Sequence, residues 1–241
     1  MHFPRSLVRA TLLRRYKRFL ADVRFDDGTE AVAHCANPGS MLGLAVPGSA
    51  IWPAPAGGTG RKLAWSWQLV AAGNGLVGIN TGLANRLAEE AIAAGRIPEL
   101  AGYASLRREV KYGTGSRIDF LLEDPARPPC YVEVKSVTLS RQPGLAEFPD
   151  STTARGAKHL RELALVADNG KRAVMLYLAQ REDCDRFALA ADIDPAYAAG
   201  LAVALSHGVE TLCYGCTLSP DAIEVSRPIP FVPCGTRRVS P

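Results

Sequence analysis

SRIDFLLEDPARPPCYVEVKSVT, residues 116–138, is typical of two short strands joined by a proline-rich turn. The first strand covers residues 117–122, a β-rich run, and the second covers residues 130–137, where side-chain character alternates. We therefore predict a β-hairpin. Because side chains alternate between the two faces of a strand, Glu133 and Lys135 point to the same side.

Three residues of this hairpin predict chemistry. Burying the carboxylate of Glu133 and the ammonium of Lys135 costs roughly several kcal/mol per ion unless a further charge compensates. A divalent cation compensates, because Mg²⁺ binds carboxylate oxygens. Asp119 supplies a second carboxylate if the hairpin register places it opposite Glu133, and Lys135 then positions a water or stabilises charge on a phosphate. The same residues are equally typical of an exposed strand with a solvated ion pair.

Composition describes an ordinary globular protein. The 241 residues are 47% hydrophobic and 22% charged, enough for one large domain or two small ones. The chain contains no apolar run that approaches the length of a membrane span and no signal-peptide core, so we expect a cytoplasmic protein. The six cysteines follow no disulfide framework, and we expect reduced thiols at Cys35, Cys130, Cys184, Cys213, Cys216 and Cys234.

Positive charge is concentrated in the first third of the chain. Residues 1–80 contain nine Lys and Arg against four Asp and Glu, and no acid interrupts residues 5–18. A basic surface of this kind favours polyanions such as nucleic acid, through counterion release. A solvated strand face is the alternative interpretation.

The same region is rich in short β-patterns. They predict a small Greek-key barrel of the oligonucleotide-binding (OB) type, with strands at 12–25, 30–35, 50–52, 63–70 and 76–80. Trp65 and Trp67 share one strand face, so they either stack on bases or pack in the core.

The remainder alternates helices and strands. Helices are expected at 82–95, 154–168 and 194–207, and further strands at 173–178, 209–218 and 222–225. Glu89 and Glu90 lie in the first helix. Glu90 is the better candidate to join Asp119 and Glu133, although both are also typical helix-surface acids. In the second helix, Arg155, Lys158, His159 and Glu162 lie off the apolar stripe. Arg155, Lys158 and Glu162 predict a polar ridge that could meet the active site or a phosphate, and His159 is a candidate general base.

Many short, dispersed sequence motifs of this chain resemble those of the sugar fermentation stimulation protein (SfsA) family. They are RRYKRFLADV (14–23), HCANPGSM (34–41), ANRL (84–87), EVKYG (109–113), SRIDF (116–120), YVEVKSVTL (131–139), FPD (148–150) and RGAKHLREL (155–163). The resemblance implies an N-terminal OB-fold, a C-terminal α/β domain like the PD-(D/E)xK nucleases, and DNA binding without marked sequence preference. It also implies a role in sugar utilisation, notably of maltose.

Carried over residue by residue, the nuclease signature falls on Glu90, Asp119, Glu133 and Lys135. The resemblance further implies that the backbone carbonyl of Val134 binds metal. Every side chain of the signature is present, which favours a nuclease dependent on Mg²⁺ or Mn²⁺. The alternative is a noncatalytic DNA-binding regulator of sugar utilisation.

We predict an OB domain at residues 1–81 and a nuclease-like domain at residues 82–241. The expected DNA contacts are Arg14, Arg15, Lys17, Arg18, Arg117, Arg155 and Lys158. The sequence predicts no membrane partner and no particular oligomeric state.

Overall fold

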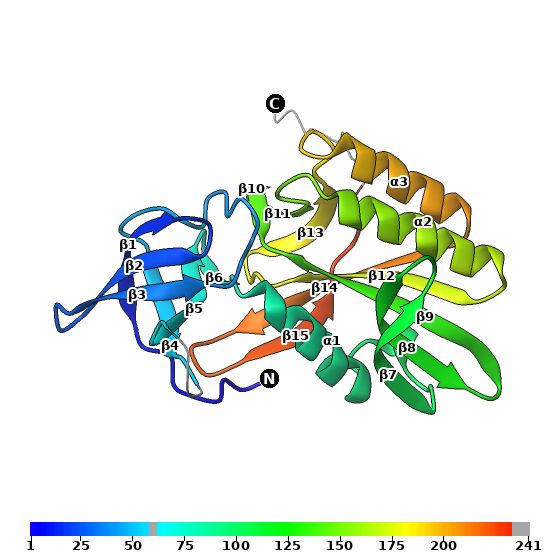
Figure 1. Ribbon diagram of the computed structural model, residues 1–241, viewed down its shortest axis with the longest axis horizontal. Coiled ribbons are helices and arrows are strands. Elements are labelled where there is room, and N and C mark those ends of the chain that lie inside the picture. Colours follow the sequence, from blue (N-terminus) through cyan, green and yellow to red (C-terminus); the bar gives the residue numbers. More distant parts are fainter. Residues whose placement is uncertain (58–61, 233–241) are drawn as a thin grey trace.

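The computed structural model describes residues 1–57 and 62–232. Two units lie side by side in Figure 1, a β-barrel formed by the first third of the chain and a sheet flanked by helices. Cys234 lies outside the described residues, and the other five cysteines are buried free thiols. In the described part of the chain, no helix is both long and apolar enough to span a bilayer.

Five strands close the barrel, and a sixth extends one of them as a hairpin. The strand order is β3-β2-β1-β4-β5-β6, and parallel pairing of β3 with β5 closes the ring. Apolar side chains such as Leu12, Ile51 and Trp67 fill the interior. The strands are β1 (Ala10–Tyr16), β2 (Leu20–Phe25), β3 (Glu30–Cys35), β4 (Ala50–Pro55), β5 (Trp65–Ala72) and β6 (Gly75–Gly78).

One strand prediction in the barrel is wrong. The run 12–25 is not one strand, because β1 and β2 form a hairpin that turns at Lys17 and Arg18. Both residues have positive φ angles, 46° and 62°, a conformation that usually takes Gly or Asn. The sequence therefore contained no turn signal at this point.

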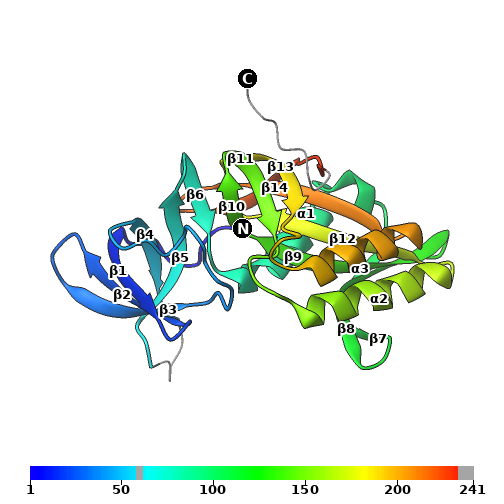
Figure 2. The ribbon, with the colours of Figure 1, turned by 90° about the horizontal axis from the view of Figure 1, so that it is seen from above.

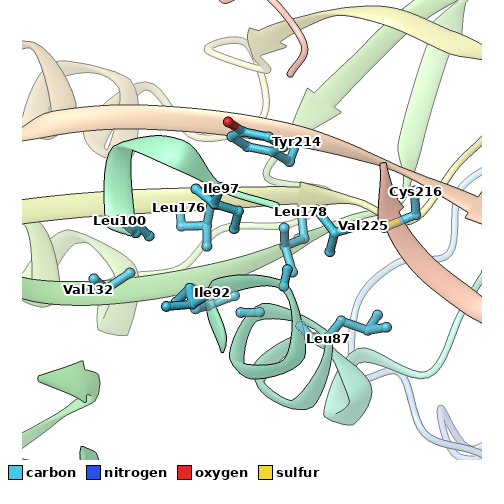
Figure 3. Close-up of a cluster of buried hydrophobic side chains, with 14 of the residues drawn as sticks. Leu87, Ile92, Ile97, Leu100, Val132, Leu176, Leu178, Tyr214, Cys216 and Val225 are labelled. Atoms are coloured by element: carbon cyan, nitrogen blue, oxygen red, sulfur yellow. The ribbon is translucent and has the colours of Figure 1, made fainter. Parts of the chain in front are cut away.

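The second unit is built on a six-stranded mixed sheet of order β15-β14-β12-β9-β8-β7. Helix α1 packs on one face, and helices α2 and α3 pack on the other (Figures 1 and 2). Figure 3 shows Leu87 and Ile92 of α1 among side chains of the sheet. The helices are α1 (Ala84–Ala93), α2 (Ala154–Asp168) and α3 (Pro195–Ser206), with 3₁₀ turns η1 (Thr81–Leu83) and η2 (Pro98–Leu100).

The strands of this sheet are β7 (Ser105–Tyr112), β8 (Ser116–Asp124), β9 (Arg127–Val137), β12 (Arg172–Ala179), β14 (Glu210–Leu218) and β15 (Ile223–Pro228). A second sheet of three short strands consists of β10 (Leu139–Gln142), β11 (Gly144–Phe148) and β13 (Cys184–Leu189). The sequence patterns predicted the hairpin β8–β9 and the three helices. They did not predict β7 or the small sheet.

Direct bonds join the barrel to the second unit. The N–H of Gly78 in β6 donates to the carbonyl of Gln180 at 2.8 Å. The loop 37–41 contacts Asp150, whose carboxylate accepts from the N–H of Met41 at 3.3 Å. Asp150 lies four residues before α2, so this loop of the barrel reaches the helix that faces the candidate site.

Candidate active site

The candidate site lies at a fork in the main sheet. Pairing of β8 with β9 stops at Phe120 and Val132. Beyond this point β8 continues along β7, whereas β9 continues along β12. Asp119 and Glu133 are the first residues past the last pair, one on each strand. The predicted hairpin therefore brings both carboxylates to the point where its strands separate.

Asp119 is held by two hydrogen bonds. Its Oδ2 accepts from the backbone N–H of Val134 at 2.7 Å, and its Oδ1 accepts from the side-chain amide of Asn85 at 2.7 Å. Burial raises the pKa of Asp119, and the nearby charge of Glu133 raises it further. The two carboxylates thus repel each other in the absence of a cation.

Glu133 is almost fully buried, with 3% of its surface exposed. Its Oε1 accepts from the Lys135 ammonium at 2.6 Å and contacts Nδ1 of His159. Burial alone would raise the pKa of Glu133, but the hydrogen bond from His159 and the charge of Lys135 outweigh burial and lower it. Glu133 is therefore ionised at neutral pH.

His159 has a defined tautomer in this arrangement. Its Nε2 accepts from Nε of Arg155 at 3.3 Å, so the ring proton lies on Nδ1 and is donated to Glu133. Sequence analysis placed His159 and Glu162 off the apolar stripe of α2, and the structure buries both. Their exposed fractions are only 3% and 5%, because α2 turns them towards β9 and towards the β7–β8 hairpin.

The donor set fits a hard divalent cation. Oε2 of Glu133 is buried without a hydrogen-bond partner in the described structure, and the Asp119 carboxylate stands across the fork. The pKa of the Tyr112 phenol is raised by burial and then by the charges of Glu133, Glu162 and Asp119, which indicates a negative local potential. Among the described residues, no three His, Cys, Asp or Glu side chains gather as a ready cluster. The two carboxylates alone thus leave most of the ligand shell of such a cation to water and phosphate, as hard divalent cations commonly bind.

Comparison with known proteins gives a family. A model described as "SfsA N-terminal OB domain" matches residues 13–79, and one described as "Sugar fermentation stimulation protein RE domain" matches residues 82–222. This chain belongs to the SfsA family. The OB barrel followed by a mixed α/β domain, predicted from the sequence, is thereby confirmed.

Relatives of the same family match over nearly their full length. The sugar fermentation stimulation protein homolog of Rhodospirillum centenum is 62% identical over 227 residues, covering 94% of this chain and 97% of the relative. The homolog of a Ruegeria species is 59% identical over 231 residues, covering 95% of this chain and 100% of the relative. A solved structure of Pyrococcus furiosus SfsA in complex with Ca²⁺ has a TM-score of 0.86 and 29% identity, covering 96% of this chain and 98% of that one.

The structure does not bring Glu90 to the fork. Its carboxylate binds the N-terminal amine of Met1 at 3.0 Å and Nε of Arg86 at 3.0 Å. Five residues along an α-helix rotate a side chain by about 140°, so Glu90 lies on a different face of α1 from Asn85, which does reach Asp119. Glu89 lies only about 40° from Asn85 by the same geometry and binds Arg108 of β7.

Three of the basic residues predicted in the barrel are engaged within the fold. Arg14 pairs with Asp22 at 2.6 Å. Arg15 donates to the carbonyls of Arg18, Asn37, Gly39 and Ser40. Arg18 donates to the carbonyl of Pro38 at 3.0 Å. The family motif at residues 34–41 and the basic segment at residues 14–18 thus form one structural unit. In it, Arg15 and Arg18 hold the loop that contacts Asp150.

The predicted basic residues of the second domain lie around the fork. Arg155 contacts His159, and Lys158 donates to the carbonyl of Thr114 at the β7–β8 turn at 3.2 Å. Arg117 lies in β8, two residues before Asp119. Sequence reasoning missed Asn85, the second residue of α1, although it lies within the family-matching segment 84–87.

Proposed function

We propose that this chain is a DNA phosphodiesterase that depends on Mg²⁺ or Mn²⁺ and acts without marked sequence preference. The observation that carries the proposal is the fork, where Asp119 and Glu133 are the first residues past the last β8–β9 pair and Lys135 binds Glu133. Membership of a family with an OB domain supports nucleic acid as the substrate. The Ca²⁺ in the complex of the Pyrococcus protein supports a divalent ion. The proposal also keeps residues 1–81 and 82–241 as the two domains.

Each side chain at the fork has a role in this proposal. A divalent ion at the fork would lower the pKa of a bound water and neutralise charge on the phosphate. Asp119 is oriented for the ion by Asn85 and by the Val134 amide. Glu133 offers its unpaired Oε2, while His159 and Lys135 fix its Oε1.

Lys135 carries the charge needed opposite the phosphate. Glu133 fixes the Lys135 ammonium within the fork, where the Lys135 side chain is 15% exposed. An ammonium fixed in this way stabilises the negative charge that grows on phosphate oxygens during attack, without reorganising. The Val134 carbonyl completes the proposed ligand set.

A second function is favoured by the position of Glu90. With Glu90 bound to Arg86 on another face of α1, the fork holds two carboxylates rather than three. A fork with this reduced set fits a DNA-binding protein that does not cleave, acting as a regulator of sugar utilisation. The names of the relatives refer to stimulation of sugar fermentation.

Cleavage assays separate the two functions. The full chain, Lys135→Met and the control Arg96→Gln are incubated with single-stranded, duplex and branched DNA in Mg²⁺, Mn²⁺ or EDTA. Arg96 is a surface residue paired with Glu224 of β15, so its loss should leave cleavage unchanged. Nuclease function predicts that the wild type and the control cleave DNA in Mg²⁺ or Mn²⁺ but not in EDTA, and that Lys135→Met does not cleave under any condition. DNA binding without cleavage by any of the three proteins would favour the regulator.

A further inference from the structure

Two positive side chains stand directly opposite each other on the β7–β8 hairpin. Lys111 of β7 is the register partner of Arg117 of β8, and both are exposed. The Cβ atoms of directly opposed residues in an antiparallel pair are separated by roughly 5 Å, and like charges in this position are destabilising. The hairpin therefore contains a repulsive pair near its turn.

Other cations of the hairpin are neutralised, and this pair is not. Arg107 binds Glu123 at 2.8 Å, and Arg108 binds Glu89 at 3.1 Å. Within residues 1–57 and 62–232, neither Lys111 nor Arg117 forms an ion pair with an acid. Arg107 and Arg108, farther from the turn, thus each pair with an acid, one on β8 and one on α1, whereas Lys111 and Arg117 close to the turn form no ion pair among the described residues.

Helix α2 fixes the turn that follows this pair. Lys158 donates to the Thr114 carbonyl, and Glu162 accepts from the N–H of Thr114 at 3.2 Å. Gly113 has a φ of +57° and lies against the Glu162 carboxylate, where a Cβ would overlap it. The backbone of the two cations is therefore held in place by the same helix that contacts Glu133 through His159.

The pair is also close to the fork. Arg117 precedes Asp119 by two residues, which is roughly 7 Å along a strand. We propose that Lys111 and Arg117 together bind the DNA phosphate next to the one attacked at the fork. This inference rests on the proposed function, and it adds a subsite to it. An anion between the two cations removes their repulsion, which explains why the hairpin keeps them opposed.

This arrangement predicts opposite effects on folding and on binding. Without DNA, removing one of the two charges relieves repulsion and stabilises the chain. With DNA, the same change removes a phosphate contact and weakens binding equally for all sequences. Removing a cation that served only solubility would change neither the stability of the chain nor its binding of DNA.

The experiment uses the full chain with Lys111→Gln, Arg117→Gln, the double variant and the matched control Arg107→Gln. Binding of a fluorescein-labelled duplex is measured by anisotropy in Ca²⁺ across a salt series. Each single variant should reduce the slope of log K against log[salt] by about 1. The control also removes one positive charge from β7, but that charge is paired with Glu123, so its slope should stay near that of the wild type.

Urea unfolding of the same four variants gives the second readout. At low salt the unfolding midpoint should rise in each single variant, and the double variant should gain no more than either, because one substitution already ends the repulsion. The control should not rise, because it loses an ion pair. High salt should reduce the gain by screening.

Three outcomes overturn the inference. Wild-type salt slopes in both single variants would remove the phosphate subsite and leave the proposed nuclease intact. Midpoints that do not rise would show that the pair is not repulsive. A wild-type chain that binds no duplex would end both the inference and the proposed function.

Discussion

Neutralising each of the two carboxylates at the fork should change the stability of the metal-free fold in opposite directions. Asp119→Asn keeps both hydrogen bonds, because an amide oxygen can accept from Val134 and its NH₂ can donate to a reoriented Asn85. It removes the charge that Glu133 repels. Since the pKa of Asp119 is raised by burial and by Glu133, ionised Asp119 destabilises the metal-free fold, and the substitution should stabilise it.

Glu133→Gln should destabilise the chain. It leaves the ammonium of Lys135, whose side chain is 15% exposed, without its counter-charge. Breaking a buried ion pair costs about 3–5 kcal/mol, and we expect about 3 kcal/mol because Gln retains an oxygen at this position. For a chain of this size 1 kcal/mol corresponds to about 2–4 °C in Tm, so the expected fall is about 6–12 °C.

The raised pKa of Asp119 also determines how the stability difference between Asp119→Asn and the wild type depends on pH. A carboxyl group whose pKa is raised on folding contributes stability below its ordinary value of 3.8 and loses it as pH rises through the folded pKa. The advantage of Asp119→Asn over wild type should therefore be absent near that value and present at pH 7. Thermal and urea unfolding in EDTA, from pH 3.5 to 7.5, measures it.

Calcium should reverse the ranking. An ion at 100 times its dissociation constant stabilises the native state by about 2.7 kcal/mol, and this gain should appear in the wild type and be lost in Asp119→Asn. If both substitutions lower stability in EDTA, or if both leave the calcium gain intact, the reasoning about repulsion at the fork is refuted.

Two further predictions concern the contact between the domains. Gly39→Ala places a methyl group on the Asp150 carboxylate and should cost about 1–3 kcal/mol in urea unfolding, whereas Gly57→Ala, with open space around it, should be neutral; equal effects would contradict the close approach. Arg15→Gln loses charged hydrogen bonds to the 37–40 loop and should cost about 1.5–3 kcal/mol, with Lys17→Gln as the neutral control, and an unchanged midpoint for Arg15→Gln would show that the loop does not depend on this side chain.

The core of the candidate site could be predicted because it depends on local periodicity. Alternation along residues 130–137 places Glu133 and Lys135 on one side, and the structure joins them by a hydrogen bond. The short turn after residue 122 pairs the two strands closely enough to bring Asp119 near. Helix α2 was predicted with the observed limits of Ala154–Asp168, because its apolar stripe stops at Asn169, although its N-cap is Thr153 rather than Ser151 or Thr152.

The rest depends on how the elements pack. Which face of α1 meets the sheet decides between Asn85, Glu89 and Glu90, and no period within the helix determines that rotation. His159 belongs to the site only because α2 crosses β9. The turn at Lys17 was missed because its positive φ is stabilised by the barrel rather than by residue type.

The account depends above all on an ion shared by Asp119 and Glu133. Crystals of the full chain grown or soaked with Mn²⁺ would test this directly through anomalous scattering. We predict one strong peak at the fork, at about 2.1 Å from an oxygen of each residue, and no peak there in Asp119→Asn. A peak held by other side chains, or no peak at saturating Mn²⁺, would contradict the central claim.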